Sequence, residues 1–251
     1  ALLSLLDEGV LTLTLNRPER LNALSTGLLA DLAAALDEGV AAGARAVLLT
    51  GAGRAFSSGA DLAGDGGVTA NLGDTLTAFY HPLFERIAGL GLPIVCGLNG
   101  PAVGAGVALA LAADIVVMAR SAYLQLGFVN IGLVPDAGAT WLVARGAGRA
   151  KALEMVLLGE QMTAQQAQAA GLVARVVDDE ALAAEALGLA RRLASGPTIA
   201  VGLIRRQVAA ALDLDLAETM ALEASNQTTA GRTSDFREGV MAFLNKRAPR
   251  F

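Results

Sequence analysis

The hydrophobic positions near the start of the chain follow two periods, one typical of strands and one typical of helices. Residues 10–15 alternate apolar and polar side chains, which predicts a strand with its leucines on one face. Residues 25–43 repeat an apolar side chain at every fourth position, which predicts a helix with Ser25 as its N-cap and Gly43 at its end. A second strand is expected at residues 45–50. These elements indicate an α/β protein.

The longest apolar segment, residues 94–113, carries no charged side chain. Roughly 20 apolar residues are enough to cross a bilayer, so the segment has the length of a membrane span. Asn99, Gly100 and Pro101 interrupt it, however, and lipid does not tolerate the unsatisfied backbone groups of a broken helix. Residues 115–118 are again apolar. We therefore expect a buried strand, a glycine-rich turn, a buried helix and another strand, and no membrane segment.

Polar and helical patterns dominate the rest of the chain. Residues 64–73 are rich in Gly and Asp and predict a mobile loop, followed by a helix over 74–88 in which Pro82 is placed to cause a kink. A strand is expected at 122–126, and the strand-rich part is expected to stop near residue 130. The later helices are bounded by Gly159, Thr163 and Gly171, and they are followed by helices at 181–194 and 199–212 and by a helical tail from residue 215.

Composition and charge exclude several classes of function. The 251 residues carry a formal net charge of −5, which argues against nucleic acid as a partner. The single Cys96 excludes a disulfide framework and favours a cytoplasmic setting, and no secretory signal pattern opens the sequence. The single His81 argues against a multi-histidine metal site and against a Ser-His-Asp triad. We expect His81 to be a packed helix residue, with a role in catalysis as the alternative.

A strand runs into a loop of small residues and then a helix at two places in the sequence. The first junction leads from residues 48–51 to 58–61, and the second from 96–99 to 103–106. Free N–H groups at such junctions attract negative charge, so two neighbouring junctions are able to form an oxyanion hole. Close packing of helix on sheet is the alternative explanation of the small residues. Neither loop has the spacing of a nucleotide-binding fingerprint.

Five ordered motifs resemble the crotonase (enoyl-CoA hydratase/isomerase) superfamily over nearly the whole chain. They are 15–24 (Leu-Asn-Arg-Pro-Glu-Arg-Leu-Asn-Ala-Leu), 53–62 (Gly-Arg-Ala-Phe-Ser-Ser-Gly-Ala-Asp-Leu), 93–100 (Pro-Ile-Val-Cys-Gly-Leu-Asn-Gly), 132–138 (Gly-Leu-Val-Pro-Asp-Ala-Gly) and 237–247 (Arg-Glu-Gly-Val-Met-Ala-Phe-Leu-Asn-Lys-Arg). The resemblance implies a spiral core of ββα units over residues 1–190 and a helical C-terminal trimerisation region over 191–251. It also implies a homotrimer or dimer of trimers.

The resemblance implies an acyl-CoA thioester as substrate, with no separate cofactor and no metal. By motif position, the N–H groups of Ala60 and Ala105 would hold the thioester oxygen; Ala105 stands where the family usually has glycine. The residues implied in coenzyme A binding are Arg20, Ala23, Ser58, Asp61, Leu62, Phe243 and Lys246. Ordinary solvated charge is the alternative for Arg20 and Lys246, and we interpret Asp61 mainly as a structural cap.

The acidic residues distinguish a hydratase from an isomerase. Hydratases of this family resemble one another in carrying two glutamates, and the corresponding positions are Ala108 and about residues 129–130, with no acid at either. Asp136 remains, at a place where isomerases of the superfamily often carry their single acid, and the chain is most similar to isomerases that act on ring-epoxidised phenylacetyl-CoA in phenylacetate catabolism. We therefore predict an isomerase with Asp136 as acid and base. The alternative for Asp136 is a structural role as a turn or N-cap residue. An enoyl-CoA hydratase with an unusual second group and a non-catalytic acyl-CoA-binding subunit remain open alternatives.

Overall fold

A six-stranded sheet forms the centre of the computed structural model, which describes residues 1–63 and 71–251. The strands are β1 (Leu2–Asp7), β2 (Val10–Leu15), β3 (Ala46–Gly51), β4 (Ile94–Leu98), β6 (Ile115–Ala119) and β9 (Arg175–Val177), in the order β1-β2-β3-β4-β6-β9. Only β1 and β2 pair antiparallel among these neighbours. A smaller sheet consists of β5 (Ala102–Val103), β7 (Tyr123–Gln125) and β8 (Gln161–Thr163). The predicted α/β class is confirmed.

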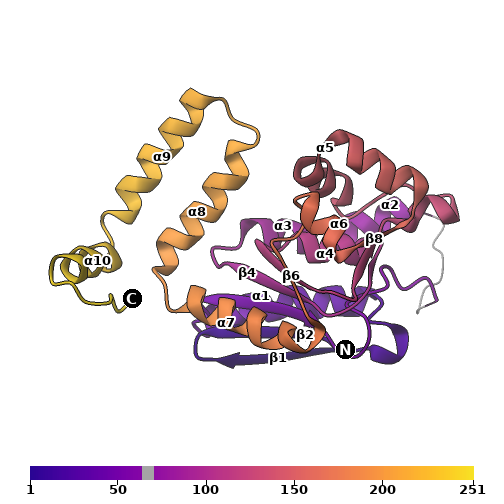
Figure 1. Cartoon of the computed structure of the whole chain (residues 1–251), viewed down its shortest axis with the longest axis horizontal. Helices are drawn as coiled ribbons and strands as arrows, with labels where there is room; N and C mark the ends of the chain where they lie inside the picture. Colours follow the sequence, from indigo (N-terminus) through magenta and orange to yellow (C-terminus); the bar gives the residue numbers. More distant parts are fainter. Residues whose placement is uncertain (64–70) are drawn as a thin grey trace.

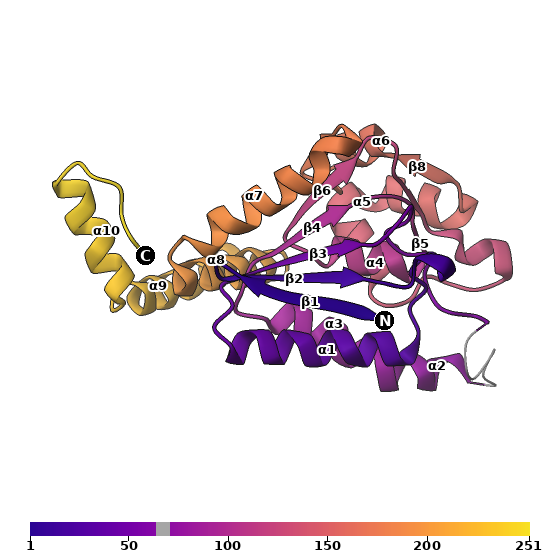
Figure 2. The ribbon, with the colours of Figure 1, turned by 90° about the horizontal axis from the view of Figure 1, so that it is seen from below.

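Helices cover both faces of the large sheet. Figure 2 shows α1 (Thr26–Ala41) and α3 (His81–Gly89) on one face and α7 (Leu182–Ala194) on the other. The remaining helices of the body are α2 (Leu72–Thr75), α4 (Ala105–Leu111), α5 (Ala139–Leu158) and α6 (Ala164–Ala169), with short 3₁₀ helices at Pro18–Arg20, Gly127–Ile131 and Asp179–Ala181. The last three helices, α8 (Thr198–Ala211), α9 (Leu216–Ala230) and α10 (Ser234–Leu244), form an arm that extends away from the body (Figure 1).

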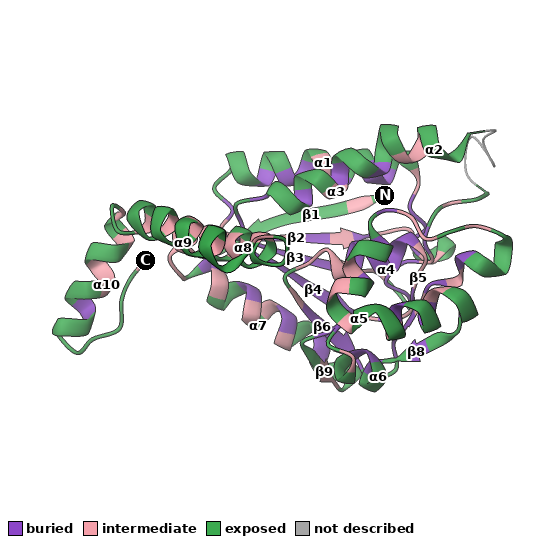
Figure 3. Cartoon of the chain, turned by 90° about the horizontal axis from the view of Figure 1, so that it is seen from above, coloured by how far each residue is buried: buried purple, intermediate pink, exposed green. Residues whose placement is uncertain are grey.

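The apolar segment at 94–113 lies where the sequence places it, at the centre of the core. It forms β4, a turn, β5 and α4, and nearly all of its side chains are buried. Figure 3 shows the same distribution over the molecule, with buried residues in the sheet and on the inner helix faces and exposed residues along the arm. No helix in the part of the chain that the structure describes combines the length and the apolar character needed to cross a bilayer.

The predicted helix boundaries are largely correct, because their capping chemistry is local. Ser25 accepts a hydrogen bond from the Leu28 N–H at 3.2 Å and so begins α1. Thr163 begins α6 with a complete capping box, and Gly159 ends α5 in the left-handed region. The interruption after residue 194 separates α7 from α8 as expected. The predicted division of the chain at residues 190 and 191 stays a prediction.

Two expectations are wrong and one strand was not predicted, each for a physical reason. Strands do not stop near residue 130, because β8 and β9 follow; each has three residues, too few to show a period. The edge strand β1 lacks a clean alternation and is exposed along most of its length. The helix expected at 74–88 is interrupted by a π-helical turn at Leu76–Tyr80, and Pro82 lies in the first turn of α3, where no intrahelical N–H is required. Most of the loop expected at 64–73 lies outside the described residues.

A buried arginine fixes the base of the arm to the core. Arg205 of α8 donates hydrogen bonds to the carbonyl oxygens of Ile87 at 2.6 Å and Leu90 at 2.7 Å, which satisfies the C-terminal end of α3. Its guanidinium also pairs with Asp114 at 2.6 Å, and the Asp114 carboxylate accepts the Ile94 N–H at 2.7 Å. Asp114 is therefore a structural residue that links α8 to β4.

Candidate active site

The two small-residue loops meet beside the carboxyl ends of β3 and β4, which are parallel neighbours. Ser57 and Ala102 form an isolated parallel bridge between the loops. A methyl group added to Gly59 would lie 3.5 Å from the Ala105 nitrogen and 2.7 Å from the Val103 carbonyl oxygen. Because Gly59 also has φ +88°, only glycine fits this contact. The residue before Ala60 therefore touches the segment that carries Ala105, as the prediction of one shared anion site requires.

Both predicted N–H donors are available. Ala105 is the first residue of α4, so its N–H has no intrahelical acceptor. Leu24 pairs with the two peptide groups that flank Ala60, through the Gly59 carbonyl oxygen and the Asp61 N–H. The N–H of Ala60 consequently faces away from Leu24. Among the described residues, neither the Ala60 nor the Ala105 N–H donates a hydrogen bond.

Two buried polar side chains hold the first loop in shape. Asn22 donates hydrogen bonds to the carbonyl oxygens of Ala52 at 2.9 Å and Ala55 at 2.8 Å. The Ser57 hydroxyl donates to the Asn22 carbonyl oxygen at 2.9 Å and accepts the Gly59 N–H at 3.2 Å. Neither residue was singled out from the sequence. The available signal was that both residues lie within motifs of the resemblance, Asn22 in 15–24 and Ser57 in 53–62.

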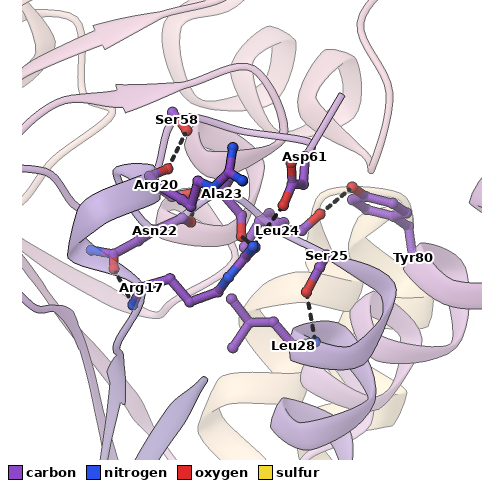
Figure 4. A network of polar contacts seen from close by, with 11 residues as sticks. Arg17, Arg20, Asn22, Ala23, Leu24, Ser25, Leu28, Ser58, Asp61 and Tyr80 are labelled. Carbon is purple, nitrogen blue, oxygen red and sulfur yellow. Dashed lines mark hydrogen bonds and ion pairs between the residues drawn. The ribbon is translucent and has the colours of Figure 1, made fainter. Parts of the chain in front are cut away.

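Asp61 belongs to a network that surrounds the first donor (Figure 4). Its carboxylate pairs with Arg17 at 2.8 Å, and Arg17 also donates to the Ala23 carbonyl oxygen at 2.7 Å. The Asp61 N–H and the Tyr80 hydroxyl both donate to the Leu24 carbonyl oxygen, at 3.2 and 3.3 Å. Asp61 is therefore a structural residue, but it acts as the buried ion-pair partner of Arg17 and not as a helix cap. Sequence reasoning missed Arg17.

The residues predicted to bind coenzyme A divide into two groups. Arg20, Ala23, Ser58 and Asp61 lie together around the first loop, and the Ser58 hydroxyl donates to the Arg20 carbonyl oxygen at 3.4 Å (Figure 4). Leu62 follows Asp61 in the chain and is exposed. Phe243 lies on α10 and Lys246 just after it, at the far end of the arm (Figure 1). Within one chain the structure does not bring these two residues to the loops. Their predicted contact with coenzyme A therefore requires the arm of a neighbouring copy.

Asp136 lies in a separate wall of the site, between the 3₁₀ helix at Gly127–Ile131 and α5. Its Oδ1 atom is buried and has no hydrogen-bond partner among the described residues. Burial raises the pKa of this carboxyl group to about 6, although the charge of His81 partly opposes the shift. The alternative of an N-cap role is wrong, because α5 has Gly138 as its N-cap and no side-chain cap, whereas the alternative of a turn is confirmed for the backbone, since the Asp136 carbonyl oxygen accepts the Ala139 N–H at 2.8 Å. A buried carboxylate without a partner is instead a candidate for proton transfer.

Asp136 lines a cavity of about 510 Å³. The described residues of its wall are mostly apolar: Leu72, Gly73, Leu76, His81, Leu133, Val134, Pro135, Ala137, Gly138, Thr140 and Trp141. Asp136 is the only acidic residue among them. His81 is exposed at the start of α3 and faces this cavity, so the expectation of a packed helix residue is wrong.

Tyr80 lies between the two parts of the site. Its side chain is buried, and burial raises the pKa of its hydroxyl group above the usual value. The charges of Asp136 and Asp61 raise this pKa further, so both carboxylates lie within electrostatic reach of one hydroxyl. The cavity with Asp136 and the loop with Ala60 are therefore parts of one site. The phenol stays protonated there and remains a hydrogen-bond donor.

The positions where hydratases of the family carry acids hold none. Ala108 is fully buried on α4. Val129 is half-exposed in the 3₁₀ helix at Gly127–Ile131, and the Asn130 amide beside it donates to the Gly159 carbonyl oxygen at 3.4 Å. None of these side chains is able to activate a water molecule by proton transfer.

A spiral α/β body with two free N–H donors and a carboxylate on an apolar cavity is typical of a class of acyl-CoA enzymes. The chain belongs to the enoyl-CoA hydratase/isomerase family, whose sequence profile matches residues 6–251. It is 47% identical to 1,2-epoxyphenylacetyl-CoA isomerase of Escherichia coli K12, over 100% of this chain and 97% of that protein. It is 43% identical to a probable enoyl-CoA hydratase of Rhodobacter capsulatus, over 98% of this chain and 95% of the relative.

Solved structures confirm the predicted crotonase fold. The enoyl-CoA hydratase of Bacillus anthracis superimposes with a TM-score of 0.94 at 32% identity, covering 100% of this chain and 98% of that one. A putative enoyl-CoA hydratase/isomerase of Mycobacterium abscessus gives a TM-score of 0.92 at 34% identity, covering 100% and 99%. The protein is therefore an enzyme of the crotonase superfamily, in the group of acyl-CoA isomerases and hydratases.

Proposed function

We propose that this enzyme is an acyl-CoA isomerase in which Asp136 acts as acid and base and the N–H groups of Ala60 and Ala105 hold the thioester oxygen. The observation that carries the proposal is the carboxylate of Asp136, the one acidic group in the described wall of an apolar cavity, whose Oδ1 atom is buried without a partner. Addition of water needs groups that position and activate a water molecule, and Ala108 supplies none. Movement of a proton between two carbons of one substrate needs only one base.

The proposed reaction starts when the Asp136 carboxylate removes a proton from a carbon near the thioester. The C–H electron pair then delocalises toward the carbonyl oxygen, and the negative charge that develops there is held by the two N–H donors. The protonated Asp136 returns the same proton to a different carbon of the conjugated system. The product is an isomer of the substrate, so the reaction balances without an oxidant, a cofactor or water.

Two substrate types fit this mechanism. A 3-enoyl-CoA would undergo a shift of its double bond, and a ring-epoxidised phenylacetyl-CoA would be rearranged, as the name of the E. coli relative suggests. The apolar wall with Leu133, Val134 and Trp141 suits a ring or a short acyl chain. We propose that coenzyme A binds along Arg20, Ala23, Ser58, Asp61 and Leu62. Phe243 and Lys246 would come from a neighbouring subunit of a homotrimer or dimer of trimers.

Hydratase activity is the second candidate, because the R. capsulatus relative is named a probable enoyl-CoA hydratase. Comparing the rates of two reactions distinguishes it from the proposed isomerase activity. We expect the enzyme to convert 3-hexenoyl-CoA to 2-hexenoyl-CoA much faster than it hydrates crotonyl-CoA, because the described wall of the cavity has one acidic residue. Both reactions are followed by thioester absorbance on the same preparation. Fast hydration with slow isomerisation would overturn the proposal. Tight binding of both thioesters without turnover would instead indicate a binding subunit.

The pH dependence of isomerisation tests the proposed ionisation of Asp136. A base must be deprotonated to accept a proton, and the pKa of Asp136 is raised to about 6. We therefore expect kcat/KM to increase with pH and to reach half of its plateau near pH 6. Stopped-flow assays with 3-hexenoyl-CoA on both sides of this value measure the profile. A rate that falls as pH rises through this range would show that the residue works as an acid first.

A further inference from the structure

His81 occupies a position in the cavity that the proposed proton shuttle does not explain. The described wall offers an acidic, imidazole or hydroxyl group at only three residues, Asp136, His81 and Thr140. The His81 imidazole makes no hydrogen bond to any described residue. In a site that is otherwise apolar, the few polar groups fix the orientation and the identity of the ligand.

The local backbone places this imidazole on the cavity wall. The His81 N–H donates to the Leu76 carbonyl oxygen and closes the π-helical turn at Leu76–Tyr80. In a regular α-helix, residues five positions apart point in directions that differ by roughly 140°. The i to i+5 hydrogen bond of a π-turn brings them nearly above one another, and both Leu76 and His81 line the cavity. The π-turn thus directs an imidazole to the place where an α-helix would direct another side chain.

His81 also lies within electrostatic reach of Asp136, since its charge acts on that carboxyl group. An acyl group whose reacting carbon faces Asp136 would therefore pass close to the imidazole. A hydrocarbon acyl chain offers no acceptor to the imidazole N–H, which would then have only water as a partner, because His81 is exposed. An acyl group that carries an oxygen atom would satisfy it.

We propose that His81 is the specificity-determining residue of this cavity and that its imidazole N–H binds an oxygen atom carried by the acyl group, such as an epoxide, ether or hydroxyl oxygen. The proposal rests on the assignment of the cavity to the acyl group in the proposed function. A site that hydrogen-bonds a substrate oxygen rejects the analogue that lacks it, whereas apolar contacts alone discriminate weakly. The enzyme would consequently prefer oxygen-bearing acyl groups over hydrocarbon ones.

A pair of ligands that differ by one oxygen atom tests the proposal. Phenylacetyl-CoA and 2-hydroxyphenylacetyl-CoA are titrated by calorimetry into the wild type and into the variants His81→Leu and His81→Gln. We expect the wild type to bind the hydroxylated ligand roughly tenfold more tightly, the effect of one net hydrogen bond. His81→Leu should lose this preference and keep its affinity for phenylacetyl-CoA, and His81→Gln, which retains an N–H, should keep part of it. Thr140→Val removes the hydroxyl group of the described wall and should leave the preference intact.

The single histidine supplies a second measurement that does not depend on a variant. In nitrogen-15 NMR spectra, the imidazole signals of the wild type should move with the hydroxylated ligand and not with phenylacetyl-CoA. An equal preference in the wild type and His81→Leu would overturn the proposal, and so would an equal loss of affinity for both ligands. A wild type that shows the preference but isomerises no thioester would contradict the proposed function alone.

Discussion

Replacement of Asp136 by Asn is expected to lower kcat for 3-enoyl-CoA isomerisation by roughly 10²–10⁴-fold, the contribution of a positioned acid–base group. The amide has the shape of the carboxyl group but is unable to accept the proton. KM should change little, because the donors at Ala60 and Ala105 are untouched. With a substrate deuterated at the acidic carbon, transfer of the deuterium to the new carbon, followed by NMR, should be lost to the same extent. The matched control is Asp31→Asn, which changes an exposed carboxylate on α1.

The stability of the Asn variant separates a chemical effect from unfolding. In the folded chain, burial raises the pKa of Asp136 from its ordinary value of 3.8 to about 6. The folded state therefore favours the protonated form, and ionisation of Asp136 lowers stability as pH rises from the lower value through the higher one. Above pH 6 the Asn variant should melt at a temperature at or above that of the wild type, with no difference at strongly acidic pH. Wild-type turnover by a folded Asp136→Asn protein would remove Asp136 from the mechanism.

The parts of the molecule that depend on local chemistry could be predicted from the sequence. A serine, threonine or glycine at a helix end acts on the next few residues, so Ser25, Thr163 and Gly159 were recognisable. The division of the uncharged segment 94–113 was also predictable, because Asn99, Gly100 and Pro101 themselves break a helix. Such signals identify elements and their ends.

The parts that depend on contacts between distant segments could not be predicted. Arg17 and Asp61 are 44 positions apart in the sequence, and nothing in either segment indicates their ion pair. His81 appeared to be a packed helix residue, because the π-turn that directs it into the cavity has no period that a sequence pattern reveals. The resemblance to a family indicated Asp136, whereas only the structure shows that its Oδ1 atom is buried without a partner.

Replacement of Ala105 by proline tests the second donor without removing any other polar group. Ala105 is the first residue of α4, a position where proline is well tolerated because the N–H has no helical acceptor. Gly104 before it has φ 53° and ψ −125°, outside the α region that a following proline disfavours. The change deletes one N–H group and places a ring carbon where the thioester oxygen would bind.

We expect the Ala105→Pro variant to lose roughly 10²–10³-fold in kcat, the effect of removing one oxyanion-hole donor. The loss should apply to every thioester substrate, since all share the carbonyl oxygen, whereas the loss in His81→Leu should depend on the acyl group. Ala105→Gly keeps the N–H and serves as the control, and thermal unfolding of both variants shows whether α4 is intact. Full activity of a folded Ala105→Pro enzyme would mean that the thioester oxygen is held elsewhere, because proline has no N–H group to donate to it.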